Sequence, residues 1–138
     1  MDHFTLIDGA MHAEQVPLAA IAAAVQTPVY VYSTATIERH ARVFREAVAG
    51  CGAGEPLVAF AVKANPNGAV LATLARAGLG ADVVSEGEML RALHAGVAPE
   101  KIVFSGVGKT AAEMARALDA GIGQFNLESE EEAEMLSA

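Results

Sequence analysis

The sequence predicts an α/β fold: part of a (β/α)8 TIM-type barrel, about four β-α units long, behind a short N-terminal segment. The first observation is a repeat: short apolar runs with strand character begin near Leu57, Ala81, Ile102 and Gln124, at intervals of 21 to 24 residues, and a helical segment follows each run. Such units give parallel strands joined by right-handed crossovers. A doubly wound sheet has the same periodicity and stays open as an alternative. Because eight strands close a barrel, we expect these 138 residues to be part of a longer protein.

The second observation is a set of signals at both ends of the predicted helices. Serine or threonine followed three residues later by glutamate is typical of a helix N-terminus, because the two side chains satisfy free backbone N–H groups there. Three such pairs are present: Ser85 with Glu88, Thr110 with Glu113, and Ser129 with Glu132. Glycines that could adopt the left-handed conformation of a helix end close the units at Gly78, Gly96 and Gly121.

The N-terminal segment is predicted to begin with a hairpin. Asp8-Gly9 separates two strand-like runs, Phe4 to Ile7 and Met11 to Ala13, and Asp-Gly favours the tight turns that join such strands. Pro17 is expected at the first position of a short helix that runs from Leu18 to Val25.

The following stretch is expected to lead into the repeat. Pro28 ends the first helix, and the β-branched and aromatic run Val29 to Tyr32 is predicted as a strand. Ser33 is a candidate N-cap for a helix that stops at Gly50. A loop from Cys51 to Pro56 completes the connection.

Composition and charge exclude several classes of protein. The formal net charge is −8 and no basic cluster is present, so we expect no nucleic-acid partner. No apolar run is long enough to span a bilayer and the first residues lack the features of a signal peptide, so we expect no membrane association. Cys51 is the single cysteine, and a reducing, cytoplasmic location is the simple interpretation. The four histidines show no ligand spacing, so no metal site is predicted.

In either α/β architecture, chemistry is expected at the carboxyl ends of the strands. The polar residues there are Lys63, Asn65 and Asn67; Asp82, Ser85, Glu86 and Glu88; Ser105 and Lys109; and Asn126, Glu128 and Ser129. Lys63 ends the apolar run from Leu57 to Val62, and an amine beside such a strand is partly desolvated, which favours its neutral, nucleophilic form. The ordinary alternative is a solvated lysine that starts a loop, and position alone favours that alternative.

A glycine-rich stretch after the third predicted strand raises a different function. Gly108-Lys109-Thr110 matches the end of a nucleotide-binding P-loop, which also requires a glycine five residues before Gly108. Val103 occupies that position, inside the predicted strand, so the loop is too short to wrap a triphosphate. The simpler interpretation is a tight turn with Thr110 as a helix cap.

Four motifs, in order along the chain, resemble those of the fold-type III pyridoxal-phosphate-dependent decarboxylases. FAVKANPN (60–67) is similar to the cofactor-lysine motif of that family, and GADVVSEGE (80–88) and QFNLES (124–129) are similar to the motifs on later strands. IVFSGVGKT (102–110) is particularly similar to the diaminopimelate decarboxylases. YVYST (30–34) also resembles the family's entry into the barrel.

The resemblance implies roles for four residues. Lys63 would hold pyridoxal 5'-phosphate through a Schiff base, which overturns the ordinary interpretation of this lysine. Asp82 would lie near the cofactor and set the electrostatics around Lys63. Glu88 would be a partner near the same amine, or only a helix-capping carboxylate, and Ser105 would lie at the rim of the site.

The resemblance also implies a reaction, the decarboxylation of meso-diaminopimelate to L-lysine and CO2 in bacterial lysine biosynthesis. Ornithine- or arginine-like decarboxylases, a non-catalytic half-barrel that binds pyridoxal phosphate, and a P-loop-like nucleotide binder stay open as alternatives. Residues 1–27 would associate with a β-domain that the chain does not contain, and residues 28–138 would be the first half of the barrel. The groups that stack on the cofactor ring and bind its phosphate would lie beyond Ala138, so we expect the chain alone to be inactive and the full-length form to be a homodimer.

Overall fold

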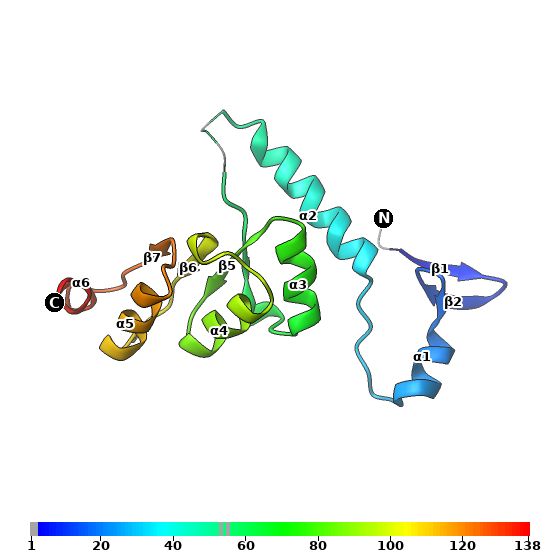
Figure 1. The fold of residues 1–138 in the computed structure, drawn as a ribbon. Coiled ribbons are helices and arrows are strands. Elements are labelled where there is room, and N and C mark those ends of the chain that lie inside the picture. The colour runs from blue at the N-terminus through cyan, green and yellow to red at the C-terminus, as the bar shows by residue number, and fades with distance from the viewer. Residues whose placement is uncertain (1–2, 53, 55) are drawn as a thin grey trace.

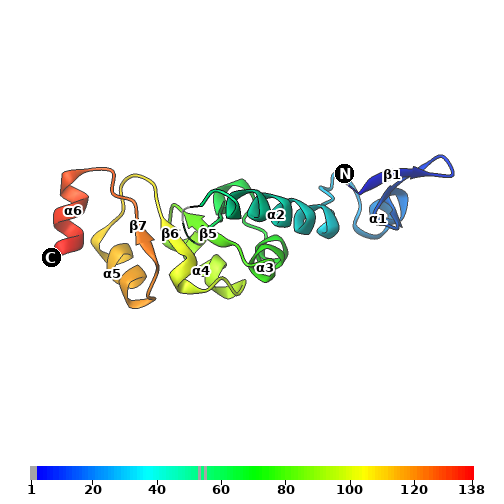
Figure 2. The ribbon, with the colours of Figure 1, turned by 90° about the horizontal axis from the view of Figure 1, so that it is seen from above.

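The computed structural model describes residues 3–52, 54 and 56–138, and these residues form two sheets. One is a small antiparallel sheet of three strands near the N-terminus, and the other is a parallel sheet of four strands. The molecule is elongated, with the antiparallel sheet at one end and the C-terminal helix at the other (Figures 1 and 2). The parallel sheet confirms the predicted α/β class.

The predicted N-terminal hairpin is present. Strand β1 (Phe4–Ile7) pairs antiparallel with β2 (Ala10–Ala13), and β3 (Val16–Pro17) adds a third strand beside β2. Asp8 and Gly9, which join β1 and β2, have φ angles of 48° and 79°. Two consecutive positive φ angles define the type I′ turn that Asp-Gly favours.

Two predictions for the next stretch are wrong. Helix α1 (Leu18–Val25) has the predicted bounds, but Pro17 is its N-cap, with an extended ψ of 133°, and not its first residue. The run Val29–Tyr32 is extended but not a strand, because among the described residues no neighbouring strand offers it backbone partners. The predicted loop from Cys51 to Pro56 lies partly outside the described residues.

Helix α2 (Thr34–Ala49) leads into the repeat. The Ser33 side chain accepts a hydrogen bond from the N–H of Thr36, and Gly50 is the C-cap, as predicted. Ala41 of this helix is buried in a cluster with Val70, Leu74 and Leu79. Helix α2 is thus held against the first unit of the repeat.

The parallel sheet contains the four predicted β-α units in sequence order. Its strands are β4 (Ala59–Ala61), β5 (Gly80–Val83), β6 (Ile102–Phe104) and β7 (Gln124–Phe125). The helices that follow them are α3 (Gly68–Arg76), α4 (Glu86–His94), α5 (Ala111–Asp119) and α6 (Glu130–Ser137). Two short 3-10 helices are inserted, η1 (Val62–Ala64) after β4 and η2 (Pro99–Lys101) before β6.

The helices cover one face of this sheet. Ala81, Val83, Ile102 and Phe104 are at most 1 % exposed and form the main core with helix residues such as Met89. Because successive strand residues point to opposite faces, the positions between them face away from the helices. That face corresponds to the interior of a complete barrel.

The strand register places four residues in one row across this interior face. Ala61 is paired with Asp82, Asp82 with Val103, and Val103 with Gln124. Lys63, Ser105 and Asn126 lie two residues beyond members of this row. The carboxyl edge therefore collects side chains that are 20 or more residues apart in the sequence.

The predicted caps form, with one change in their geometry. Thr110 and Glu113 make a full capping box. Ser85 and Ser129 also accept from the backbone N–H three residues later, but in both pairs the glutamate reaches one residue further back than predicted: Glu88 to the N–H of Val84 and Glu132 to the N–H of Glu128. The predicted helix-closing glycines, Gly78, Gly96 and Gly121, all have φ between 74° and 91°.

Candidate functional site

The carboxyl edge of the parallel sheet brings together most of the residues that the sequence singled out. Lys63 lies in η1, directly after β4, and Asp82 lies in the neighbouring strand β5. Ser105 follows β6, and its backbone N–H donates to the carbonyl of Val83 at 2.8 Å, so it continues the pairing with β5. Three of the four predicted site residues thus lie at the same edge.

Lys63 is exposed at this edge. The desolvation expected from its apolar run is therefore wrong for the described residues, because the strand ends at Ala61 and the side chain starts beyond the core. Lys63 makes no hydrogen bond or ion pair with any residue that the structure describes, and this includes Asp82. Its amine is chemically available.

Asp82, in β5, is hydrogen-bonded to a residue that follows β6, on the side of β5 away from β4 and Lys63. Its Oδ1 accepts a hydrogen bond of 2.5 Å from the hydroxyl of Ser105. The same hydroxyl oxygen accepts a bond of 3.0 Å from Nδ2 of Asn126, which follows β7. Asp82 and Ser105, both half-buried, are therefore in direct contact, as their common assignment to one site requires.

Glu88 does not face the lysine. Its Oε2 accepts a hydrogen bond of 2.9 Å from the backbone N–H of Val84, and its own N–H donates to the Ser85 side chain. This carboxylate fixes the turn between Asp82 and helix α4, which is the capping role that the sequence offered as the alternative.

Lys109 is the second lysine at this edge, and its amine is bonded to other residues of the chain. Its side chain is 1 % exposed, and its Nζ lies 2.9 Å from Oε2 of Glu132 and donates to the carbonyl of Gly106 at 2.5 Å. Oε1 of Glu132 also accepts from the backbone N–H groups of Gly108 and Lys109. An amine held in this way cannot reach a phosphate, so the geometry argues against the P-loop alternative.

Glu132 is held ionised by these contacts. The hydrogen bond from Lys109 and that from the N–H of Glu128 lower its pKa to about 2, against burial, which acts to raise it. The sequence predicted only a helix-terminal carboxylate at this position. The S-x-x-E spacing gave its location, but the pairing with Lys109 joins two successive β-α units and has no local signal.

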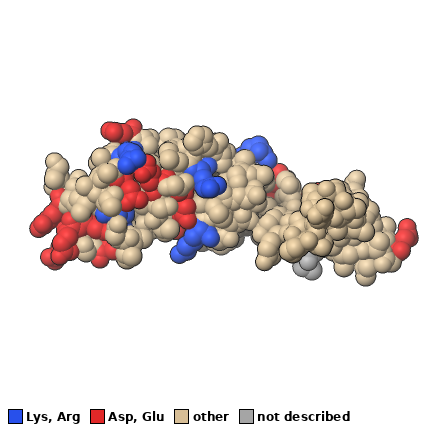
Figure 3. Space-filling view, turned by 90° about the horizontal axis from the view of Figure 1, so that it is seen from below, with Lys and Arg blue, Asp and Glu red and all other residues tan. Residues whose placement is uncertain are grey.

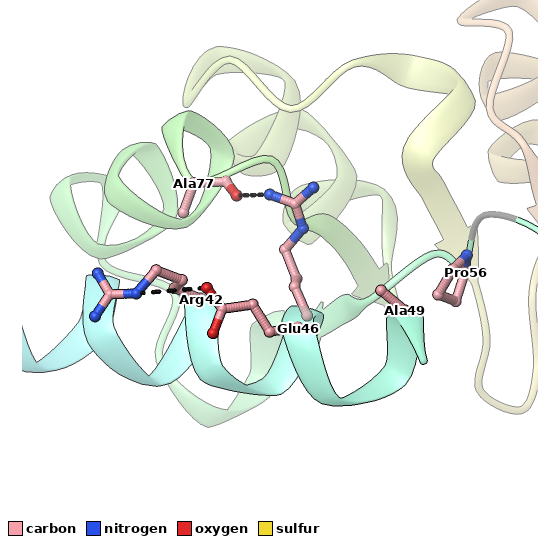
Figure 4. Close-up of a pocket in the computed structure, with 6 residues that line it drawn as sticks. Arg42, Glu46, Ala49, Pro56 and Ala77 are labelled. Carbon is pink, nitrogen blue, oxygen red and sulfur yellow. Dashed lines mark hydrogen bonds and ion pairs between the residues drawn. The ribbon is translucent and has the colours of Figure 1, made fainter. Parts of the chain in front are cut away.

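Several cavities lie away from these residues, including one of about 650 Å³ beside the N-terminal segment that is lined by His3, Glu14, Gln15, Val16 and Ala35. Another of about 420 Å³ is lined by Arg42, Arg45, Glu46, Ala49, Pro56 and Ala77, at the amino end of the strands (Figure 4). Arg45 reaches from α2 and donates to the carbonyl of Ala77 at 2.6 Å, at the end of α3. This arginine satisfies a free helix carbonyl, so we interpret the cavity as a packing feature and not as the chemical site.

Acidic side chains gather at the end of the molecule that holds α6, whereas the N-terminal segment shows little charge on the same face (Figure 3). The first turn of α6 contributes Glu130, Glu131 and Glu132. Within the ranges 3–52 and 56–138 no group of three or more His, Cys, Asp or Glu side chains could hold a metal ion. In the same ranges no helix has the length and apolarity to cross a membrane.

The donor set at the carboxyl edge fits a cofactor that carries an aldehyde. A primary amine without an internal partner can form a Schiff base. A carboxylate on the adjacent strand, fixed by a hydroxyl, can orient a cationic group beside it. Lys63, Asp82 and Ser105 are therefore the residues that could hold pyridoxal phosphate in this part of the fold.

Comparison with known proteins gives a match over most of the chain. Residues 34–138 match the pyridoxal binding domain of the pyridoxal-dependent decarboxylases. The chain is 59 % identical over 134 residues to a diaminopimelate decarboxylase of Zymomonas mobilis, covering 97 % of this chain and 32 % of that protein. A Vibrio cholerae diaminopimelate decarboxylase is 54 % identical over 138 residues, covering 99 % of this chain and 32 % of its own length.

A solved structure supports the same relationship. The crystal structure of diaminopimelate decarboxylase from M. jannaschii in complex with L-lysine superimposes with a TM-score of 0.87 at 33 % identity, covering 96 % of this chain and 31 % of that one. The chain therefore spans about a third of the length of the curated relatives it matches.

Proposed function

This chain belongs to the pyridoxal-dependent decarboxylase family, and on that premise we propose that it is the N-terminal part of a diaminopimelate decarboxylase. The reaction would convert meso-diaminopimelate to L-lysine and CO2. The observation that carries the proposal is the free amine of Lys63 at the carboxyl edge of the sheet, within the matched pyridoxal binding domain. The identities of 52 to 59 % to relatives of that name support the substrate.

Lys63 would hold the cofactor covalently through its amine. When bound, pyridoxal phosphate supplies a ring that accepts the electrons released when the bond to the substrate carboxylate breaks. The same amine would also be able to take up or release a proton beside the cofactor. Its exposure on the interior side of the sheet supports this role, because a substrate must be able to reach it.

Asp82 and Ser105 would orient the groups around that amine. The Ser105 hydroxyl donates to Asp82, which fixes the carboxylate on the strand next to Lys63. Glu88 would contribute at one remove, because its bond to the N–H of Val84 holds the turn that follows Asp82. We therefore assign Glu88 as a positioning residue of the site.

The division into residues 1–27 and 28–138 is part of the proposal. The N-terminal segment contacts the rest of the described chain through Glu14, whose carboxylate accepts from the Ser33 hydroxyl at 2.7 Å and from the N–H of Ala35 at 2.9 Å, and through His3, whose Nδ1 lies 3.1 Å from the Thr36 hydroxyl. Leu6 and Val25 are 68 % and 61 % exposed, which supports burial of this segment against a further domain. A homodimer and a cytoplasmic location complete the proposal.

The test of the cofactor lysine is a titration with pyridoxal phosphate followed by borohydride reduction and peptide mass mapping. We expect an adduct on Lys63 that is lost in Lys63→Ala and retained in Lys101→Met, a variant of the half-buried lysine at the opposite edge. Labelling spread over Lys101 and Lys109, or no labelling, would contradict the assignment.

The substrate is tested separately, in the protein at its natural length. Release of CO2 from meso-diaminopimelate is expected to exceed that from L-ornithine or L-arginine by orders of magnitude. Preference for ornithine or arginine would move the protein to another branch of the family and would leave Lys63 as the cofactor lysine. An adduct on Lys63 without any decarboxylation would instead support the non-catalytic alternative.

A further inference from the structure

A directional chain of hydrogen bonds runs along the carboxyl edge of three adjacent strands. Nε2 of Gln124 donates to Oδ1 of Asn126 at 2.6 Å, and Nδ2 of Asn126 donates to the Ser105 hydroxyl oxygen at 3.0 Å. The Ser105 hydroxyl then donates to Oδ1 of Asp82 at 2.5 Å. The chain ends on the carboxylate that lies on the strand next to Lys63.

Each member can play only one part in this arrangement. An ionised carboxylate accepts but cannot donate, so the single proton of Ser105 is directed to Asp82. The hydroxyl oxygen is then an acceptor for Asn126, and this requires the amide group of Asn126 to face Ser105 with its NH2. Gln124 fixes that orientation, because its own NH2 takes the Asn126 carbonyl.

The backbone around the chain is set by the strands. The N–H of Ser105 donates to the carbonyl of Val83 at 2.8 Å, and the N–H of Asn126 donates to the carbonyl of Phe104 at 2.9 Å. Ser105 and Asn126 therefore extend the β5–β6 and β6–β7 pairings beyond the strand ends. Side chains based on paired backbone hold their geometry more closely than side chains on free loops.

We infer that Asn126 is a positioning residue of the site, which acts through Ser105 to fix the Asp82 carboxylate, with Gln124 setting its orientation. This inference rests on the proposed function, since it assumes that Asp82 acts on the Lys63 amine. Asn126 adds a donor to the hydroxyl and restricts its rotation, so that the Ser105 hydroxyl keeps donating its hydrogen bond to Asp82. Without Asn126 the hydroxyl can turn to water, and the Asp82 carboxylate, no longer held by its donor, is free to turn toward the Lys63 amine.

The alternative is that these hydrogen bonds only hold the ends of the three strands together. The two possibilities differ in what they do to Lys63. A tie between strands contributes to the stability of the fold and leaves the reactivity of the amine unchanged. A positioning residue changes the pH at which Lys63 reacts, because an unshielded carboxylate favours the ammonium form, which cannot attack an aldehyde.

The experiment measures the rate of borohydride-trapped adduct formation at Lys63 with pyridoxal phosphate over a range of pH, together with the melting temperature of each variant. Ser105→Ala is expected to slow trapping by about tenfold or more at a fixed pH below the midpoint of the rate against pH, the effect of one lost hydrogen bond to a charged group. Asn126→Leu is expected to slow it in the same direction by a smaller factor. Asp82→Asn, which removes the charge, is expected to accelerate it.

The double variant Ser105→Ala/Asn126→Leu decides the matter. If Asn126 acts through Ser105, the double variant traps at the same rate as Ser105→Ala alone, whereas independent effects would multiply. Multiplied effects, or an Asn126→Leu variant that melts earlier but keeps the wild-type pH profile, would overturn the inference. Failure of the proposed function has a different signature: no trapping at Lys63 in the wild type, or an Asp82→Asn variant that reacts like the wild type.

Discussion

The two edges of the parallel sheet are built by different means. At the amino edge two strand starts lie in close contact with backbone: a Cβ added to Gly80 would lie 2.2 Å from the carbonyl oxygen of Lys101, and one added to Gly123 would lie 2.2 Å from that of Glu100. Both oxygens belong to η2, which is therefore wedged between the starts of two strands. No side chain fits between these elements.

At the carboxyl edge the contacts are made by side chains. Asp82 is bonded to Ser105 and Ser105 to Asn126, and Lys109 is paired with Glu132. Backbone contacts therefore set the geometry of the amino edge, whereas side-chain identity sets the geometry of the carboxyl edge. The carboxyl edge is also where barrel enzymes carry their catalytic residues.

The largest expected effect is at the amino edge. Gly80→Ala forces a methyl group against the η2 backbone, and we expect a loss of about 3 kcal/mol or more in the free energy of unfolding. Urea unfolding followed by circular dichroism measures it. The matched control is Gly68→Ala at the first residue of α3, where an added Cβ meets nothing within 4 Å; it should stabilise by up to about 1 kcal/mol. Equal free energies of unfolding in the two variants would contradict the tight backbone contact at Gly80, and with it the proposed difference between the two edges.

The second prediction compares the ion-paired Lys109 at the carboxyl edge with Lys101 at the amino edge. Lys109→Met leaves Glu132 buried without its cation, and we expect a clear fall in melting temperature, because a buried charge without a partner is unfavourable. Lys101→Met is the control at the amino edge, where the single partner of Lys101 Nζ among the described residues is the Gly78 carbonyl at 3.4 Å. Its melting temperature should stay close to that of the wild type. A larger fall in Lys101→Met would show that the buried pair does not hold the carboxyl edge.

The third prediction concerns acid. Because the pKa of Glu132 is lowered from the ordinary 4.5 to about 2, its stabilising contribution is complete above pH 4.5 and is lost as the pH falls from there toward 2. Glu132→Gln should reduce the slope of stability against pH in that window. The exposed Glu134→Gln variant of the same helix serves as the control and should leave the slope unchanged. An unchanged slope in Glu132→Gln would mean that the carboxyl titrates normally in the folded protein.

Local rules predicted the parts of the fold that depend on neighbouring residues. The Asp8-Gly9 turn, the Ser33 cap and the order of strands and helices follow from patterns a few residues long. The predicted strand Val29–Tyr32 failed because a strand needs a partner, and none of the described strands supplies one. A local pattern cannot report what lies beside it.

The site shows the same division. Strand ends placed Lys63, Asp82 and Ser105 among the candidates without knowledge of the family, because parallel strands all present their carboxyl ends at one edge. The burial of Lys109 against Glu132 could not be predicted, since it depends on how two successive units stack. Gln124 was missed because it lies within a strand, and its role follows only from the register that aligns it with Val103.

The smallest expected effect is at the helix end beside the amino edge. Arg45→Ala removes the bond from Arg45 to the Ala77 carbonyl at 2.6 Å, and we expect a loss of about 0.5 to 1 kcal/mol, because a cation at a helix C-terminus contributes that amount. Arg42→Ala is the control on the same helix. Its ion pair with Glu46 spans 3.8 Å between side chains that are 64 % and 68 % exposed, so its removal should cost at most about 0.5 kcal/mol. A larger loss of unfolding free energy in Arg42→Ala than in Arg45→Ala would contradict this expectation. It would show that water satisfies the Ala77 carbonyl as well as Arg45 does, and that the amino edge depends on the backbone contacts at Gly80 and Gly123.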